Sequence, residues 1–331
     1  MYKNLLFIPF IFMLILGTLL AVSSSSWFPA WLGLEINLLS IIPLIFYNSK
    51  NQINEAAVKY FIIQALASSI IILSIVNLPH LTNFNLNLNV VTISLALSIK
   101  MALAPFHLWI PQLIESFSWL QALLILTWQK IAPIILISST SPNSLAMLLI
   151  ISSALLGSVG GFMMFSPKKI MAFSSINHSG WMLYSLLISW NLWFFYFLIY
   201  CFISLSLMLA FAQKNITNIN QINTSPKTPL LKFYFSLNLL SLAGLPPLLG
   251  FLPKLLLIFN LLKTLYSLTL LIFLMVSSLL SLYFYMKLII SMNMNPPLNF
   301  TNKPMLAPFN FFLFLNLFIN LLIPPICLLL F

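Results

Sequence analysis

The sequence predicts an all-α polytopic membrane protein with about eleven transmembrane helices. Of its 331 residues, 61% are hydrophobic and only 5% are charged, which is too few charges for the surface of a soluble protein of this length. The apolar runs are long enough to cross a bilayer as helices, and they lack the alternation of apolar and polar residues that marks a transmembrane β-barrel. The chain is therefore expected to fold within a membrane.

Windows of about 20 apolar residues define the predicted helices in chain order. The first follows Lys3 and resembles a signal peptide, but it is long enough to span, and further spans follow at once, so we expect it to be retained. No stretch indicates a soluble domain, so residues 1–331 are predicted to form one membrane domain. The predicted spans cover approximately residues 5–22, 27–47, 56–77, 90–111, 118–138, 144–165, 169–188, 190–213, 233–258, 264–290 and 308–330.

Lysine positions predict how these helices are oriented. The formal net charge is +11, and the lysines are scattered between apolar runs, which indicates a positive membrane face rather than a nucleic-acid partner. With eleven spans, the opposite face receives only Lys263, and the N-terminus lies on the positive face with the C-terminus opposite. The lysines on or near the positive face are Lys3, Lys50, Lys59, Lys168, Lys169, Lys214, Lys227, Lys232, Lys287 and Lys303.

Four ionisable residues lie well inside predicted spans: Glu35, Lys100, Lys130 and Lys254. A lysine near the middle of a bilayer costs roughly 2.5–3.5 kcal/mol on insertion scales, so three such lysines need a reason. One acid cannot neutralise three lysines, and some lysine must be neutral or face water. We expect these four residues to carry protons. The alternatives are a structural ion pair and lysines that snorkel to the surface.

Two of the predicted spans carry a lysine next to prolines. Lys100 precedes Pro105 in SIKMALAPFHLWIP (98–111), and Lys254 follows AGLPPLLGFLP (243–253). Proline ends or kinks a helix, and irregular backbone at membrane depth is tolerated only where it is buried in protein or faces water. A pair of broken helices is the usual pointer to the site of an inverted-repeat transporter. The sequence therefore predicts an inverted repeat with two proline-broken helices.

Three further residues are candidate auxiliary groups. His107 follows Lys100 by about two helical turns, and His178 lies in FSSINHSGW (173–181) within the seventh span. Both could carry protons near neutral pH, or each could be a buried histidine bonded to a backbone carbonyl. Lys59 begins its span one turn after Glu55, a spacing that suits a structural ion pair as well as an auxiliary role.

Other patterns in the chain do not predict a site. Cys201 and Cys327 stand apart in apolar runs, so neither a disulfide framework nor a metal site is expected. Gly157, Gly160 and Gly161 follow no strand and lie inside a span, where small residues allow close helix packing rather than phosphate binding. A carboxylate pair, a Ser-His-Asp set and metal-ligand spacings are all absent from the sequence, so residues for hydrolysis or metal catalysis are missing.

Five segments together resemble a known family. They are WLGLEINLLSIIP around Glu35, APFHLWIP around His107, TWQKIAP around Lys130, FSSINHSGW around His178, and LAGLPPLLGFLPK ending at Lys254. In this order and at these separations, the chain resembles the subunit 2 family of NADH dehydrogenase, the antiporter-like subunits in the membrane arm of mitochondrial respiratory complex I. The resemblance covers essentially the whole chain.

The resemblance implies a proton-translocating subunit of NADH:ubiquinone reductase, a translocase without a redox centre of its own. NADH, FMN, iron–sulfur clusters and ubiquinone would be bound by other subunits, and no metal or cofactor is expected on this chain. Glu35 and Lys100 would form an acid–lysine pair, and Lys130 would be the central relay lysine. Lys254 would lie on the second broken helix toward the exit. His107 and His178 would be auxiliary members of the polar axis.

The resemblance also implies partners and a location. The partners would be other membrane-arm subunits of complex I, including neighbouring antiporter-like subunits, together with accessory subunits and membrane lipids such as cardiolipin. The chain would lie in the mitochondrial inner membrane, with its N-terminus in the matrix and its C-terminus in the intermembrane space. Eleven spans instead of the fourteen of full-length relatives would fit the shortened animal form. The family often has glycine where this chain has Ala102, so the first break is expected to depend mainly on Pro105.

Two other functions remain open from the residues alone. The chain could be an independent cation/proton antiporter, although the absence of aspartate and the scarcity of membrane carboxylates argue against a specific sodium site. It could also be a structural spacer that holds the membrane arm together while pumping occurs elsewhere.

Overall fold

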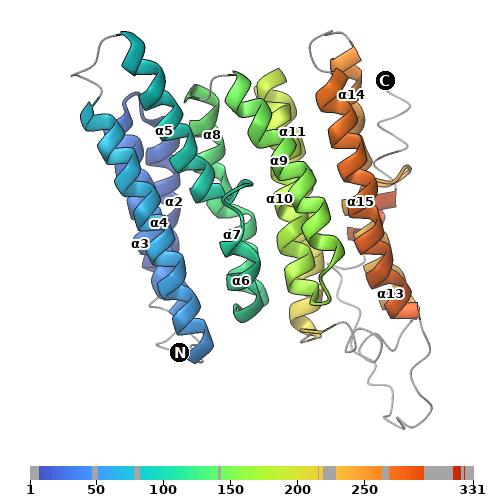
Figure 1. The fold of residues 1–331 in the computed structure, drawn as a ribbon. Coiled ribbons are helices and arrows are strands. Elements are labelled where there is room, and N and C mark those ends of the chain that lie inside the picture. Colours follow the sequence, from blue (N-terminus) through green and yellow to red (C-terminus); the bar gives the residue numbers. More distant parts are fainter. Residues whose placement is uncertain are drawn as a thin grey trace. The chain divides into compact units, whose positions relative to one another are not determined.

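The computed structural model describes residues 7–46, 51–77, 83–140, 143–214, 216–218, 229–262, 268–293, 316–321 and 324. Within these ranges the chain forms helices joined by turns and bends, and no strand (Figure 1). The fold divides into two compact units, Met1–Ser153 and Ala154–Phe331. The prediction of an all-α protein is confirmed for the described part of the chain.

The first unit is built from the N-terminal helices. Its α2 and α3 pack most closely, because Gly17 of α2 lies against α3 and Gly33 of α3 lies against α2. A Cβ added at Gly33 would lie 2.5 Å from the Ala21 nitrogen. Helix α4 packs against α3, α5 and α6. The helices are α2 (Phe7–Ser23), α3 (Trp27–Phe46), α4 (Asn51–Asn77), α5 (Asn83–Met101), α6 (Trp109–Ser116), α7 (Trp119–Leu126), the 3₁₀ turn η2 (Trp128–Lys130), α8 (Ile131–Thr140) and the start of α9 (Asn143–Phe162).

The second unit surrounds α10 (Pro167–Ile188), which is buried on nearly all of its faces. Pro167 occupies the first helical position, and the Ser166 hydroxyl accepts the Lys169 N–H at 3.4 Å, which together start the helix. Helices α11 and α15 pack against α10. The other helices are α11 (Trp190–Gln213), α13 (Pro229–Ala243), α14 (Phe251–Leu262), α15 (Leu268–Asn293) and a short helix at residues 316–321.

Among the described residues, six helices are long and apolar enough to cross a membrane: Trp27–Phe46, Gln52–Val76, Trp119–Thr140, Ser144–Phe162, Trp190–Gln213 and Thr269–Asn293. Each matches a predicted span. Helix α10 is not among them, since the polar run around His178 lowers its hydropathy. The predicted spans 90–111 and 233–258 each correspond to two helices. Most of the predicted span 308–330 lies outside the described residues.

The helix surfaces are strongly apolar. Leu39 is 59% exposed, Leu148 68% and Leu279 70%, and such side chains would be costly in contact with water. This pattern agrees with a chain whose outer faces contact lipid or neighbouring apolar surfaces. Of the lysines assigned to a membrane face, five lie outside the described residues: Lys3, Lys50, Lys227, Lys263 and Lys303.

Candidate functional site

Lys100 lies in the last turn of α5, where the helix ends abruptly. Ala102 takes a left-handed backbone conformation with φ of 54°, and the Leu103 N–H donates to the Ser98 carbonyl at 3.0 Å. This pattern is a Schellman motif, which usually needs glycine at the left-handed position. The helix thus ends at Met101, three residues before the Ala104–Pro105 peptide. The expectation that the break depends mainly on Pro105 is therefore wrong: the left-handed turn at Ala102 ends α5 before the chain reaches the proline.

The carbonyl groups at the end of α5 are satisfied by two neighbouring helices. The Gln64 side chain of α4 donates to the Lys100 carbonyl at 3.4 Å, and the Trp109 indole of α6 donates to the Ile99 carbonyl at 3.2 Å. These bonds satisfy acceptors that a helix end leaves without an intrahelical partner. They fix the position of Lys100, whose side chain is only 6% exposed. A cation is also favoured at a helix C-terminus by the helix dipole.

Glu35 lies half-buried on α3 and interacts electrostatically with Lys100. The Lys100 ammonium thus lies within the electrostatic influence of an acid that the sequence placed in a different span. Helix α3 is held on its other side by the Gln129 amide, which donates to the Asn37 side chain at 3.0 Å. A second glutamine, Gln121, donates to the Ile45 carbonyl at 2.7 Å. These bonds connect the helix carrying Glu35 to the segment carrying Lys130.

Lys130 lies where α7 and α8 are joined by a short 3₁₀ turn. The turn is closed by the Lys130 N–H, which donates to the Thr127 carbonyl at 3.3 Å, and the Thr127 hydroxyl donates to the Leu123 carbonyl at 2.7 Å. Pro133 has no N–H to continue the regular helical bonds across this point. Lys130 is 2% exposed, which makes it the most buried of the three candidate lysines. A 3₁₀ segment inside a long helix often marks a functional hinge.

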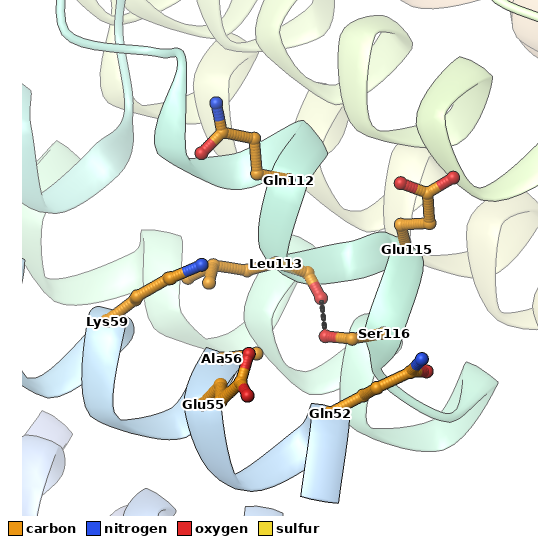
Figure 2. Close-up of a pocket in the computed structure, with 8 residues that line it drawn as sticks. All are labelled: Gln52, Glu55, Ala56, Lys59, Gln112, Leu113, Glu115 and Ser116. Atoms are coloured by element: carbon orange, nitrogen blue, oxygen red, sulfur yellow. Dashed lines mark hydrogen bonds between the residues drawn. The ribbon is translucent and has the colours of Figure 1, made fainter.

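His107 and Lys59 occupy different environments in the same unit. His107 is buried in the segment between α5 and α6, with its Nδ1 3.2 Å from the Pro105 carbonyl oxygen. Lys59 is exposed on α4 and lines an open pocket with Glu55 and Glu115 (Figure 2). His107 has the backbone contact expected of a buried histidine bonded to a carbonyl. Lys59 is exposed, unlike the candidate lysines Lys100, Lys130 and Lys254.

Lys254 lies at the second break, in the second unit. Helix α13 ends at Ala243, Gly244 is left-handed with φ of 80°, and the Leu245 N–H donates to the Leu240 carbonyl at 3.3 Å. The Lys254 ammonium donates to the free Ala243 carbonyl at 2.8 Å. A Cβ added at Gly244 would lie 2.8 Å from both Cδ and Nζ of the lysine. The glycine therefore provides the space in which the lysine side chain lies.

Aromatic side chains lie next to both Lys254 and His178 in the second unit. The Lys254 ammonium is 5.4 Å from the centre of the Trp181 ring, close enough for a cation–π interaction. His178 Nδ1 is 3.0 Å from the Tyr196 hydroxyl. Next to this histidine is a cavity of about 10 Å³, close to the space that one water molecule needs. Its lining residues are His178, Tyr196, Ile199, Tyr200, Ile203, Ser241, Leu242, Gly250 and Pro253.

Several amide side chains in the apolar helices were missed by sequence reasoning, which considered only charged groups and histidines. In the second unit, the Asn238 side-chain oxygen accepts hydrogen bonds from Ser206 at 3.1 Å and from Asn320 at 2.8 Å. The Ser277 hydroxyl donates to the Asn177 side chain at 3.2 Å and links α15 to α10. Glutamine and asparagine inside spans were the available signal, since polar side chains within a membrane cross-link helices by hydrogen bonds.

Within the described residues, no group of three or more His, Cys, Asp or Glu side chains could hold a metal ion. Cys201 is a reduced, half-buried thiol, and Cys327 lies outside the described part of the chain. The packing role predicted for the three glycines of α9 is confirmed: a Cβ at Gly157 would lie 2.6 Å from the Asn177 nitrogen, and one at Gly160 would meet the Phe173 ring.

Comparison with known proteins identifies relatives of most of the chain. Residues 24–281 match the family model described as NADH:quinone oxidoreductase/Mrp antiporter, TM. NADH-ubiquinone oxidoreductase chain 2 of Anopheles gambiae is 46% identical over 91% of this chain and 89% of its own length. The protein of the same name from Locusta migratoria is 40% identical over 87% of this chain and 85% of its own length.

Solved structures show the same fold. A chain of respiratory complex I from Thermus thermophilus with bound aureothin superposes with a TM-score of 0.79 at 26% identity, covering 86% of this chain and 70% of that chain. A chain of the Mrp complex from a Dietzia species superposes with a TM-score of 0.75 at 20% identity, covering 87% and 61%. The chain thus belongs to the NADH:quinone oxidoreductase/Mrp antiporter transmembrane family, within the group of NADH-ubiquinone oxidoreductase chain 2 proteins.

Proposed function

We propose that this chain translocates protons as a membrane-arm subunit of complex I, driven by electron transfer from NADH to ubiquinone on other subunits. The observation that carries the proposal is the burial of three lysines, Lys100, Lys130 and Lys254, which are 6%, 2% and 5% exposed. Buried cations in membrane helices are costly, and they usually belong to ion or proton pathways. The names of the relatives supply the coupled reaction.

In this mechanism, Glu35, Lys100, Lys130 and Lys254 hold and release protons, with His107, His178 and Lys59 as auxiliary groups. Glu35 stabilises the charged form of Lys100 because opposite charges attract strongly in a medium of low dielectric constant. A conformational or electrostatic signal that moves the carboxylate away would leave Lys100 without its counter-ion, and the lysine would release its proton. The hydrogen bonds from Gln129 and Gln121 to α3 support a link between that movement and Lys130.

An inverted repeat with two broken helices is part of the proposal, and its support is a shared local geometry. The breaks span residues 102–108 and 244–250, each beginning with a left-handed residue after the helix end. In each, the following N–H bonds back into the last turn of the helix. The lysines are not equivalent, since Lys100 lies on the helix before its break and Lys254 on the helix after it.

The rest of the proposal concerns location and partners. Eleven spans in the mitochondrial inner membrane, with the N-terminus in the matrix and the C-terminus in the intermembrane space, agree with the lysine distribution. Neighbouring antiporter-like subunits are the proposed partners, along with accessory subunits and lipids such as cardiolipin. NADH, FMN, iron–sulfur clusters and ubiquinone would be held elsewhere in the complex.

The central test is Lys130→Met in assembled complex I. The substitution keeps an unbranched side chain of similar length but cannot carry a proton, so NADH-driven proton pumping should fall by roughly 100-fold, the lower range for a group essential to proton transfer. Lys214→Met is the matched control, because Lys214 ends α11 and lies only half-buried. Normal pumping by assembled Lys130→Met complex would refute the relay role.

The two alternatives make different predictions. An independent antiporter would exchange cations for protons when the purified chain is placed alone in liposomes. A structural spacer would tolerate replacement of Lys100, Lys130 and Lys254 together without loss of pumping by the complex. The proposed relay predicts no exchange in the first experiment and complete loss in the second.

A further inference from the structure

The first unit contains an open polar pocket between the start of α4 and the end of α6. Its volume is about 300 Å³, far more than the space that one water molecule needs. Two of the three acids in the whole sequence, Glu55 and Glu115, line it from different helices. The full lining is Gln52, Glu55, Ala56, Lys59, Gln112, Leu113, Glu115 and Ser116 (Figure 2).

Figure 2 shows how the two walls of the pocket are arranged. Glu55 and Lys59 extend from α4 toward the space in front of Leu113, and Glu115 extends from α6. The Ser116 hydroxyl donates to the Leu113 carbonyl at 2.7 Å, which closes the last turn of α6. Both carboxylates are exposed. The pocket thus presents two proton-accepting groups and one cation to water.

Both helices that line the pocket, α4 and α6, contact the end of α5 that carries Lys100. On α4, Gln64 lies five residues beyond Lys59, about 7.5 Å along the helix, and donates to the Lys100 carbonyl. On α6, Trp109 lies one turn before Gln112 and donates to the Ile99 carbonyl. The two helices that line the pocket are therefore both hydrogen-bonded to the last turn of α5.

A pair of buried aromatic rings joins the two helices that line the pocket. Tyr60, next to Lys59 on α4, and Trp109 on α6 have ring centres 5.9 Å apart. Both side chains are buried, at 2% and 8% exposed. Rings in this position would keep water in the pocket from reaching Lys100 continuously, and a small separation of α4 from α6 would open the way.

We propose that this pocket is the proton-uptake vestibule of the Lys100 site, with Glu55 and Glu115 as its proton-collecting groups. A proton from bulk water binds a carboxylate, passes inward through water when the Tyr60–Trp109 contact opens, and leaves the carboxylate ionised for the next proton. Lys59 stabilises that ionised state. The inference rests on the proposed function and extends it to residues outside the buried axis.

The position of the pocket fits uptake rather than release. It lies at the Asn51 end of α4, immediately after Lys50 in the sequence, and the lysine distribution assigns this end to the positive face. That face is the one predicted to lie in the matrix, and the proposal takes it as the side of proton uptake. Among the described residues that line the pocket, the titratable groups are Glu55, Lys59 and Glu115.

The test is Glu55→Gln combined with Glu115→Gln in complex I reconstituted in proteoliposomes. Coupled NADH oxidation should fall roughly tenfold, less than the ~100-fold expected for a group at the reacting site, since water in the pocket still carries protons slowly. Added imidazole, a mobile proton carrier, should restore most of the rate. Glu55→Asp with Glu115→Asp retains both carboxylates and should rescue turnover. Because both glutamates are exposed, the single Gln variants should also assemble, and each should show a smaller loss.

Three outcomes would overturn the inference: an unchanged rate in the double Gln variant, a loss that imidazole does not relieve, or a loss of the same size in the double Asp variant. Lys130→Met, measured in parallel, separates this result from the proposed function. If Lys130→Met abolishes pumping while the pocket variants pump normally, only the vestibule is refuted. If Lys130→Met pumps normally, the relay itself fails.

Discussion

At the scale of single residues, the two breaks have the same left-handed backbone conformation but different amino acids at that position. Ala102 and Gly244 both follow the last residue of a helix with positive φ, 54° and 80°. Glycine adopts this conformation freely, whereas alanine brings its Cβ too close to the following carbonyl oxygen. The first break therefore carries a local cost that the second does not, and the surrounding hydrogen bonds from Gln64 and Trp109 hold it in place.

Ala102→Gly should stabilise the first unit. Relief of the left-handed strain is worth about 1 kcal/mol, partly offset by the greater freedom of glycine in the unfolded chain. The assembled complex should inactivate at a higher temperature. Ala102→Val should do the opposite by roughly 2 kcal/mol, because a β-branched side chain is poorly tolerated at positive φ and this position is fully buried. Lower thermal stability of Ala102→Gly would show that the helix end tolerates alanine without strain.

Gly244→Ala should impair function through Lys254. The added methyl group would lie 2.8 Å from the lysine Nζ, so the ammonium should lose its place against the Ala243 carbonyl and coupled turnover should fall. A double-mutant cycle identifies the cause. If the glycine acts by positioning Lys254, Gly244→Ala should have little further effect on turnover in a Lys254→Met background, an interaction of about 1–3 kcal/mol. Fully additive losses would instead indicate a general disturbance of the break.

At the scale of elements, the close crossing of α2 and α3 fixes where Glu35 lies. Gly17 and Gly33 allow the two backbones to touch, since a Cβ at Gly17 would lie 2.9 Å from the Asn37 nitrogen and the Gly33 oxygen. Close approach through small residues is a main source of helix association in membranes, where the hydrophobic effect does not favour it. The same helix also receives hydrogen bonds from Gln121 and Gln129.

Gly33→Ala should disrupt this crossing. The new Cβ would lie 2.5 Å from a backbone nitrogen of α2, and backbone cannot move aside like a flexible side chain, so we expect a destabilisation of about 1–3 kcal/mol. Less of the subunit should be recovered in assembled complex on native gels. Leu39→Ala is the matched control on the same helix, because Leu39 is 59% exposed. Equal recovery of Gly33→Ala and wild type would mean that α2 and α3 can separate without cost.

At the scale of the whole molecule, the uneven distribution of lysines predicts the orientation of the chain. Ten lysines against one across eleven predicted spans is a strong positive-inside bias, and this prediction assigns the open pocket at the Asn51 end of α4 to the positive side. The proposed role of the pocket depends on this orientation, because the same residues on the opposite face would release protons rather than collect them.

Gln52→Cys tests the orientation directly. Gln52 is exposed and lines the pocket, so a membrane-impermeant maleimide should label the new thiol in inverted submitochondrial particles and not in mitoplasts. Replacing the half-buried Cys201 by serine removes background labelling of that native thiol. Labelling in mitoplasts alone would reverse the orientation and contradict the assignment of the pocket to proton uptake.

Much of the architecture followed from the sequence because of the constraints a bilayer imposes. Long apolar runs must be helical, since backbone groups have no other partners in lipid, and the described helices agree with this. The lysines inside those runs stood out as candidates because each is expensive there. The amides of Gln64, Gln129 and Asn238 were missed, because an uncharged side chain in a span gives a weak signal until its partner on another helix is known.

The sequence alone determined the membrane class, the helical character of the chain and the burial of Lys100, Lys130 and Lys254, because transfer costs depend on residue type and run length. The tertiary structure alone decided that α5 ends at Met101, before the left-handed Ala102, that Lys254 occupies the space left by Gly244, and that Glu55 and Glu115 share one pocket. Each of these depends on contacts between residues distant in sequence or on a backbone conformation that packing stabilises. Such effects arise only when the helices are assembled.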